Sequence, residues 1–122
     1  MKCRILVADD EITIQELLKV NLEALGHEVI SAYDGKEALE CIEKEAPDLV
    51  ILDINMPEAD GWKICGELKS DKKRSGIPVI FLSAFTQKSD IEKGLSLGAE
   101  EFFTKPFNIK TLMRKVEELL KK

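Results

Sequence analysis

The sequence places three carboxylates in direct succession, Asp9, Asp10 and Glu11, after the apolar stretch ILVA. Two like charges about 4 Å apart cost roughly 4 kcal/mol at an effective dielectric constant near 20, so such a run needs a compensating partner or must splay into water. Oxygen ligands without a neighbouring histidine or cysteine favour a hard cation such as Mg²⁺. Because Mg²⁺ keeps several waters and commonly binds with phosphate, a phosphoryl group is its expected companion.

Three further residues would complete this chemistry if they lay beside the acidic run. Asp53 ends the stretch LVILD, Ser83 ends VIFLS, and Lys105 follows EFFT. A lone carboxylate is a candidate nucleophile, a hydroxyl can donate a hydrogen bond to a phosphoryl oxygen, and an ammonium is a point charge suited to another. The sequence contains neither G-x-x-x-x-G-K-[ST] nor a G-x-G-x-x-G after a strand, so nothing cradles a nucleotide. The phosphoryl group is therefore expected on a covalent bond or on a partner molecule.

An alternation of strand and helix patterns decides whether these residues can meet. Strands are predicted at 3–8, 28–32, 48–53, 79–83 and 101–105, and helices at 12–25, 34–46, after 61, at 90–97 and at 109–122. This rhythm implies an α/β fold with a doubly wound, five-stranded parallel sheet and helices on both faces. Ligands of such sheets bind beyond the carboxyl ends of the strands. A single Asp after a strand usually only caps the next helix. Three carboxylates, a hydroxyl and an ammonium at the ends of four strands are much less expected by chance.

Local signals set the ends of the predicted helices. Asp34–Glu37 and Ser89–Glu92 have the spacing of capping boxes. Gly26 and Gly98 stand where C-terminal caps belong, and Pro47 ends the second helix. The buried face of helix 12–25 is predicted from helical spacing to be Ile14, Leu17, Leu18, Leu22 and Leu25.

Length and composition fit one globular domain over residues 1–122, with 44% hydrophobic and 34% charged residues. Runs such as LVIL and VIFL are too short to span a bilayer, and no signal peptide is visible, so a cytoplasmic protein without membrane contact is expected. The net charge of −5 argues against direct binding of nucleic acid.

The cysteines and the single histidine suggest no metal or disulfide chemistry. Cys3, Cys41 and Cys65 are odd in number, far apart and without a C-x-x-C pair, so neither a disulfide framework nor a zinc site is expected. They are interpreted as small reduced core residues. His27, beside the predicted helix stop, is expected at the surface.

The strings ADDE (8–11), DINMPEADG (53–61), SA (83–84) and KPF (105–107) resemble the receiver domain of two-component response regulators. The spacing matches across essentially the whole chain, and D-x-x-M-P-x-x-x-G is the specific part. The resemblance implies a flavodoxin-like sheet with strand order 2-1-3-4-5, as in the chemotaxis regulators of this family.

The resemblance also implies a role for each site residue. Asp53 would accept a phosphoryl group from a phosphohistidine on a sensor histidine kinase or phosphotransfer protein. Mg²⁺ would be held by Asp10, Asp53 and the backbone carbonyl of Asn55, with Asp9 acting largely through water. Lys105 and Ser83 are the remaining members of the implied site: Lys105 would contact the phosphoryl oxygens, and Ser83 would move towards them after transfer.

Phe102 matches the position of the family's switch aromatic, which turns inward when the hydroxyl moves; relatives often carry Tyr there. Phe102 and Phe103 also have a simpler interpretation as core residues, because one of two adjacent strand residues must face inward. The resemblance further implies a cis Lys105–Pro106 bond. Phe85, two residues beyond the hydroxyl, is expected to slow the entry of water.

Two other functions remain open at this stage. A phosphohydrolase of the haloacid dehalogenase type would need an Asp two residues after its nucleophile, where this chain has Asn55. A pseudo-receiver, acting as a phosphorylation-independent interaction module, need not keep the full residue set. The resemblance otherwise implies no enzyme beyond a phosphoacceptor that assists its own phosphorylation and dephosphorylation.

The resemblance implies a partner surface as well. The face made by helix 90–97, strand 101–105 and helix 109–121 is predicted to change on activation and to carry partner or self-association contacts. The downstream effector is not identifiable from the sequence. Met1, two residues before the first strand, favours a native start, but both a stand-alone regulator and an excised receiver stay open.

Overall fold

The computed structural model describes residues 2–56, 59–84 and 88–121. Its main sheet has five parallel strands in the order β2-β1-β3-β6-β7, which is the predicted order 2-1-3-4-5 once a separate two-stranded sheet is set aside. The strands are β1 (Arg4–Ala8), β2 (Glu28–Ala32), β3 (Leu49–Asp53), β4 (Asn55–Met56), β5 (Ala59–Asp60), β6 (Val79–Ser83) and β7 (Glu101–Thr104). The helices are α1 (Ile12–Ala24), α2 (Gly35–Glu45), α3 (Gly61–Ser70), α4 (Lys88–Ser96) and α5 (Ile109–Leu120).

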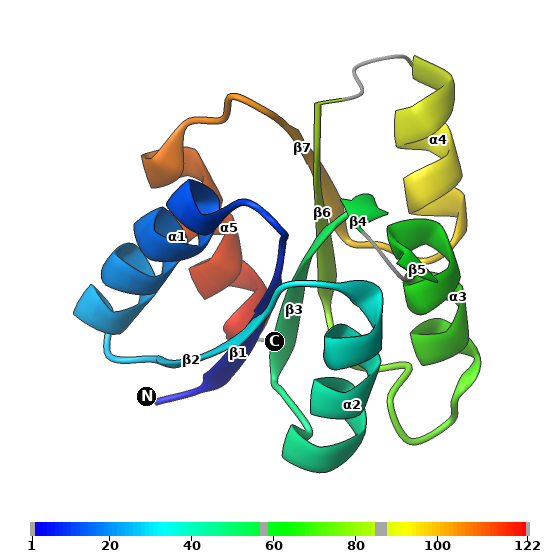
Figure 1. The fold of residues 1–122 in the computed structure, drawn as a ribbon, viewed down its shortest axis with the longest axis horizontal. Coiled ribbons are helices and arrows are strands. Elements are labelled where there is room, and N and C mark those ends of the chain that lie inside the picture. The colour runs from blue at the N-terminus through cyan, green and yellow to red at the C-terminus, as the bar shows by residue number, and fades with distance from the viewer. Residues whose placement is uncertain (1, 57–58, 85–87, 122) are drawn as a thin grey trace.

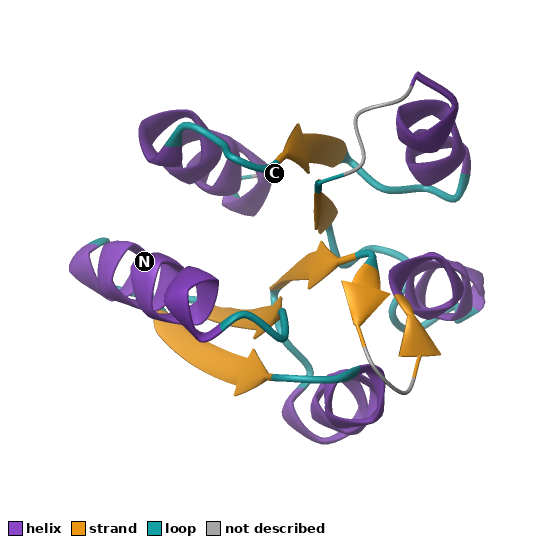
Figure 2. Ribbon diagram, turned by 45° about the horizontal axis from the view of Figure 1, so that its top comes forward, coloured by secondary structure: helices purple, strands orange, loops and turns teal. Residues whose placement is uncertain are grey.

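Helices cover both faces of the sheet, with α1 and α5 on one side and α2, α3 and α4 on the other (Figure 1, Figure 2). Every residue of β3 and β6 is buried, as their continuous apolar runs predict. Alternate residues of β3 serve the two faces: Leu49 and Ile51 pack with α1 and α5, while Val50 and Leu52 pack with α2 and α3. The predicted doubly wound α/β fold is therefore confirmed.

Helix ends follow the local signals at most places. Gly26 adopts φ 92° and Gly98 φ 101° after α1 and α4, the left-handed conformation that a glycine cap supplies. The Asp34 side chain accepts a hydrogen bond from Glu37 N at 2.8 Å, so it caps α2. The prediction at Ser89 is wrong, because α4 already begins at Lys88 and Ser89 lies within its first turn.

Two predictions about side-chain exposure are also wrong. Leu17 and Leu25 are 41% and 44% exposed, and the buried positions of α1 are Gln15, Leu18 and Leu22. His27 is 5% exposed rather than on the surface. It is buried because its ring joins two elements: Nδ1 accepts a hydrogen bond from the backbone N–H before β1, and Nε2 lies 2.9 Å from Glu117 Oε1 on α5.

A short antiparallel hairpin, β4 with β5, was not predicted and connects the end of β3 to α3. It brings Gly61 against the end of β3, where Gly61 N donates to Ile54 O at 2.8 Å. A Cβ at Gly61 would lie 2.7 Å from the Asp53 carbonyl oxygen and 2.8 Å from Ile54 Cα. The glycine that closes the string DINMPEADG is therefore required by the close packing of backbone beside Asp53.

The three cysteines are free. Cys3 and Cys65 are buried as predicted, whereas Cys41 is half-buried and packs against the core. Burial raises the pKa of the Cys65 thiol to about 11. In the part of the chain that the structure describes, no helix has the length and apolarity needed to cross a bilayer.

Candidate functional site

The carboxyl ends of β1, β3, β6 and β7 meet at one edge of the sheet because these strands are parallel neighbours. Asp9 and Asp10 follow β1, Asp53 and Ser83 end β3 and β6, and Lys105 follows β7. The last two strands are joined there by the Lys105 backbone N–H, which donates to the Ser83 carbonyl at 2.7 Å. The convergence predicted from the sequence is therefore present.

Asp9, Asp10 and Asp53 form a compact carboxylate triad, in which one oxygen from each side chain lies within 4.8 Å of the other two. Asp9 and Asp53 are 0% and 6% exposed, whereas Asp10 is exposed to solvent. Asp9 Oδ2 is buried, and it lies 3.0 Å from the Lys105 ammonium. A triad of oxygens that opens to solvent on one side fits a hard, partly hydrated cation such as Mg²⁺.

Lys105 places the positive charge of the site beside this triad. Its Nζ lies 3.0 Å from Asp9 Oδ2, 3.0 Å from Glu11 Oε1 and 3.5 Å from Asp53 Oδ2, and its side chain is only 12% exposed. Burial alone would lower the pKa of Lys105. The hydrogen bonds and charges of Asp9, Glu11 and Asp53 outweigh this effect, so the pKa is raised. Lys105 is therefore a fixed cation at neutral pH.

The end of β1 is held in place by backbone and side-chain hydrogen bonds. Asp9 N donates to Ala32 O at 3.0 Å, and Asp9 Oδ1 accepts from Glu11 N at 2.9 Å. Burial raises the pKa of the Asp9 carboxyl, and the contacts from Glu11 N–H and Lys105 offset this only in part. Burial therefore makes the ionised form of Asp9 less favourable than it is in water, despite the contact with Lys105.

Gln15, which the sequence prediction left out, supports the same turn through hydrogen bonds from its side-chain amide. Its Nε2 lies within 3.0 Å of the carbonyl oxygens of Val7 and Asp9 and 2.8 Å from that of Ala32. The end of β2 thus supplies a carbonyl, that of Ala32, which ties this strand to the site through Gln15. A polar residue at a helical core position was the available signal for Gln15.

Ser83 and Phe102 connect the site to α4. Ser83 is 1% exposed at the end of β6. Phe102 is half-buried, with its ring centroid 6.1 Å from that of Phe81 and 6.5 Å from that of Trp62. A Cβ at Gly94 of α4 would lie 3.0–3.2 Å from all three rings. Because the Phe102 ring packs against α4 at Gly94, a movement of Phe102 would require α4 to adjust its position.

Phe103 lies against the opposite core, with α1 and α5, so the two adjacent phenylalanines serve opposite faces. The Lys105–Pro106 bond is cis, as the resemblance implied. Asn55 lies in β4, two residues past Asp53. The prediction for Phe85 falls outside the described residues.

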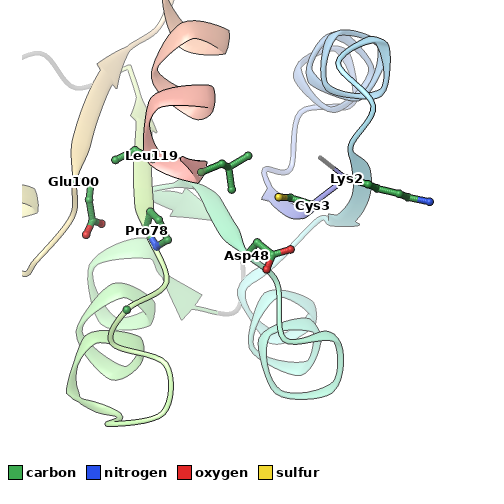
Figure 3. A pocket seen from close by; sticks show the side chains of 8 residues that line it. Lys2, Cys3, Asp48, Pro78, Glu100 and Leu119 are labelled. Atoms are coloured by element: carbon green, nitrogen blue, oxygen red, sulfur yellow. The ribbon is translucent and has the colours of Figure 1, made fainter. Parts of the chain in front are cut away.

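A hollow of about 480 Å³ lies at the other edge of the sheet, where the strands begin (Figure 3). Acidic and apolar side chains share its wall, since Asp48 precedes β3, Glu100 precedes β7 and Leu119 comes from α5. None of the carboxylates after β1 or β3 lines it. The chemistry therefore belongs to the shallow edge with the triad and not to this hollow.

Replacing Asp10 by asparagine should raise the thermal unfolding midpoint in EDTA by about 2–5 °C, because it relieves repulsion with Asp9 and Asp53 while leaving Lys105 paired. Millimolar Mg²⁺ should stabilise the wild type more than Asp10→Asn, measured by the same melting curves. Glu16→Gln, at an exposed position of α1, is the matched control and should not change the midpoint. A lower midpoint for Asp10→Asn in EDTA would contradict the repulsion.

Comparison with known proteins agrees with this geometry. The family described as "Response regulator receiver domain" matches residues 5–117. Over 121 residues the chain is 44% identical to "Probable transcriptional regulator ycf27" of Cyanophora paradoxa, covering 99% of this chain and 49% of that protein. It is 41% identical over 122 residues to the alkaline phosphatase synthesis transcriptional regulatory protein PhoP of Bacillus subtilis, covering 100% of this chain and 50% of PhoP.

Solved structures give the same answer for the fold. The chemotaxis response regulator CheY4 of Vibrio cholerae superposes with a TM-score of 0.90 at 29% identity, covering 98% of this chain and 99% of CheY4. The chain spans about half the length of the curated relatives it matches. The family match, the CheY-like fold and the residues gathered at the strand ends together show that this chain belongs to the response regulator receiver domain family.

Proposed function

We propose that the chain is a phosphoacceptor of a two-component system, in which Asp53 takes a phosphoryl group from a phosphohistidine of a sensor histidine kinase or a phosphotransfer protein. Residues 1–122 would act as one receiver domain. The observation that carries the proposal is the buried Asp53 carboxylate, which shares an edge with two further carboxylates and has the Lys105 ammonium 3.5 Å away.

In the transfer, a carboxylate oxygen of Asp53 attacks phosphorus, the P–N bond to the donor imidazole breaks, and the imidazole leaves as a neutral base after taking up a proton. Phosphoryl transfer depends mainly on positioning and on neutralising negative charge. Lys105 would bind one phosphoryl oxygen and Ser83 would donate to another. Asp10, Asp53 and the carbonyl of Asn55 would hold Mg²⁺, with Asp9 acting through water; bound there, the ion would neutralise charge on the transferred group.

Acetyl phosphate, a small phosphoryl donor, tests the proposal without knowledge of the kinase. The chain should gain one phosphoryl group by intact mass in the presence of Mg²⁺ and none in EDTA. Absence of uptake under both conditions would favour the alternative, a pseudo-receiver that binds partners without phosphorylation.

A phosphoryl group on Asp53 would carry roughly −1.5 to −2 charges in place of the single negative charge of the carboxylate. A remote partner can respond to this change only if an element of the domain has two arrangements. Helix α4 suits that role because Gly94 is its one buried residue, so little apolar burial holds it in place. We propose that the face of α4, β7 and α5 changes on activation and carries partner or self-association contacts. The named relatives are transcriptional regulators; the output would therefore lie on another segment or partner, not on this acidic domain.

Addition of beryllofluoride and Mg²⁺, which mimic the phosphorylated aspartate, should shift amide resonances in α4 and β7 as well as around Asp10, Asp53 and Lys105. The comparison is a ¹⁵N-edited NMR spectrum with and without the ligand. Shifts confined to the loops around these three residues, with residues 88–103 unmoved, would show that the domain does not signal through this face.

A further inference from the structure

Glu11 is an acidic residue of the site that has no role in the phosphoryl transfer described above. It follows the two triad residues Asp9 and Asp10, but it is not part of the carboxylate triad. Its Oε1 lies 3.0 Å from Lys105 Nζ across 94 positions of sequence. This distance equals the one from Lys105 to Asp9 and is shorter than the one to Asp53. Glu11 is thus a full partner of the lysine in the unphosphorylated protein.

The three carboxylates around Lys105 differ in how easily they can leave it. The side chains of Asp9 and Asp53 are 0% and 8% exposed, and both sit at the ends of sheet strands. The Glu11 side chain is 54% exposed at the start of α1, so it can rotate into water at little cost because exposed ion pairs contribute little.

A phosphoryl group on Asp53 needs that same ammonium. Its oxygens carry negative charge, and Lys105 Nζ lies 3.5 Å from Asp53 Oδ2. The Lys105 ammonium has three N–H donors, and the carboxylates of Asp9, Glu11 and Asp53 lie 3.0, 3.0 and 3.5 Å from its nitrogen. A phosphoryl oxygen on Asp53 therefore competes with Asp9 and Glu11 for these donors. Glu11 is the carboxylate that can be replaced, because its side chain is the most exposed of the three. While it stays on Lys105, its negative charge also repels the negatively charged phosphoryl donor.

We propose that Glu11 is a positioning residue that occupies the phosphoryl-oxygen place on Lys105 and is displaced when Asp53 is phosphorylated. It keeps Lys105 aimed into the site and compensated in the resting protein, and it slows phosphoryl capture. This inference rests on the proposed function, since it concerns the same lysine and the same acceptor.

The test is the rate of phosphoryl uptake from acetyl phosphate at a fixed concentration of Mg²⁺, followed by intact mass. Glu11→Gln keeps the length and the acceptor oxygen but removes the charge, and it should take up the phosphoryl group about fivefold faster than the wild type, the factor that a like charge about 4 Å away in water corresponds to. Glu11→Asp restores the charge and should return the rate towards that of the wild type. A merely structural role would not give this order.

Glu16→Gln is the matched control, because it removes an exposed carboxylate from the same helix, away from Lys105. It should react at the wild-type rate, and melting curves of all variants should coincide within a few degrees. A Glu11→Gln rate equal to or below that of a labelled wild type overturns the role of Glu11 alone. Absence of labelling in the wild type itself contradicts the proposed function, and the two failures are therefore distinguishable.

Discussion

The Asp53→Asn chain should take up no phosphoryl group from acetyl phosphate and Mg²⁺ under conditions that label the wild type. The amide has nearly the shape of the carboxylate but lacks its nucleophilic oxygen, so the acceptor is lost and the packing is kept. Because Asp53 is buried near other carboxylates, removing its charge should leave the unfolding midpoint unchanged or higher. Intact mass and melting curves on the same samples measure both effects.

Asp34→Asn is the matched control for this substitution. Asp34 caps α2 through Glu37 N, and asparagine caps helices about as well as aspartate does, so both labelling and stability should survive. Labelling of Asp53→Asn at the wild-type rate would remove Asp53 from its proposed role.

Gly61→Ala should lower the free energy of unfolding by about 1–3 kcal/mol, the usual cost of overpacking, and should slow labelling. The new methyl group would meet backbone atoms of Asp53 and Ile54 at 2.7 and 2.8 Å, and backbone cannot rotate away as a side chain can. Relief requires the end of β3 to shift, which moves the acceptor. Urea unfolding and the acetyl phosphate assay measure the two consequences.

Gly66→Ala on the same helix provides the contrast. Only Leu97 Cδ2 comes as near as 4.0 Å to a Cβ placed there, so the substitution should stabilise the protein by about 0.5–1 kcal/mol through helix propensity. If Gly61→Ala proved as stable as the wild type, the close approach beside Asp53 would not be a constraint on this fold.

The sheet could be predicted because its signals are local and strong. The runs LVILD and VIFLS have no polar residue to expose until their last position, and both strands are buried on each face. The β4–β5 hairpin escaped prediction because strands of two residues have no periodicity to detect. Ser89 has the composition of a cap, but local composition does not decide between starts one or two residues apart.

Predictions about single side chains failed where distant elements decide the outcome. His27 is buried because Glu117, 90 positions away, and the backbone of Cys3 supply its hydrogen bonds. Gln15 is buried because its side-chain amide donates to three backbone carbonyls. With Gln15 on the buried face of α1, Leu17 lies on the exposed side of the same helix.

The meeting of the site residues could be predicted, since parallel strands bring their carboxyl ends to one edge and each residue follows a strand. Which of the acidic residues after β1 contact Lys105 could not be predicted. Asp9, Asp10 and Glu11 are consecutive and equally acidic in the sequence, yet the ammonium contacts Asp9 and Glu11. Only the direction in which the chain turns from β1 into α1 separates them.

The central claim is that Asp53 carries the phosphoryl group. Borohydride reduces an aspartyl phosphate to homoserine, so treatment of the labelled chain followed by tandem mass spectrometry locates the modified residue. The account predicts homoserine at position 53 after incubation with acetyl phosphate and Mg²⁺, and unmodified aspartate there when EDTA replaces Mg²⁺. Homoserine at position 9 or 10 with Asp53 intact, or no homoserine in a chain exposed to acetyl phosphate and Mg²⁺, would contradict it.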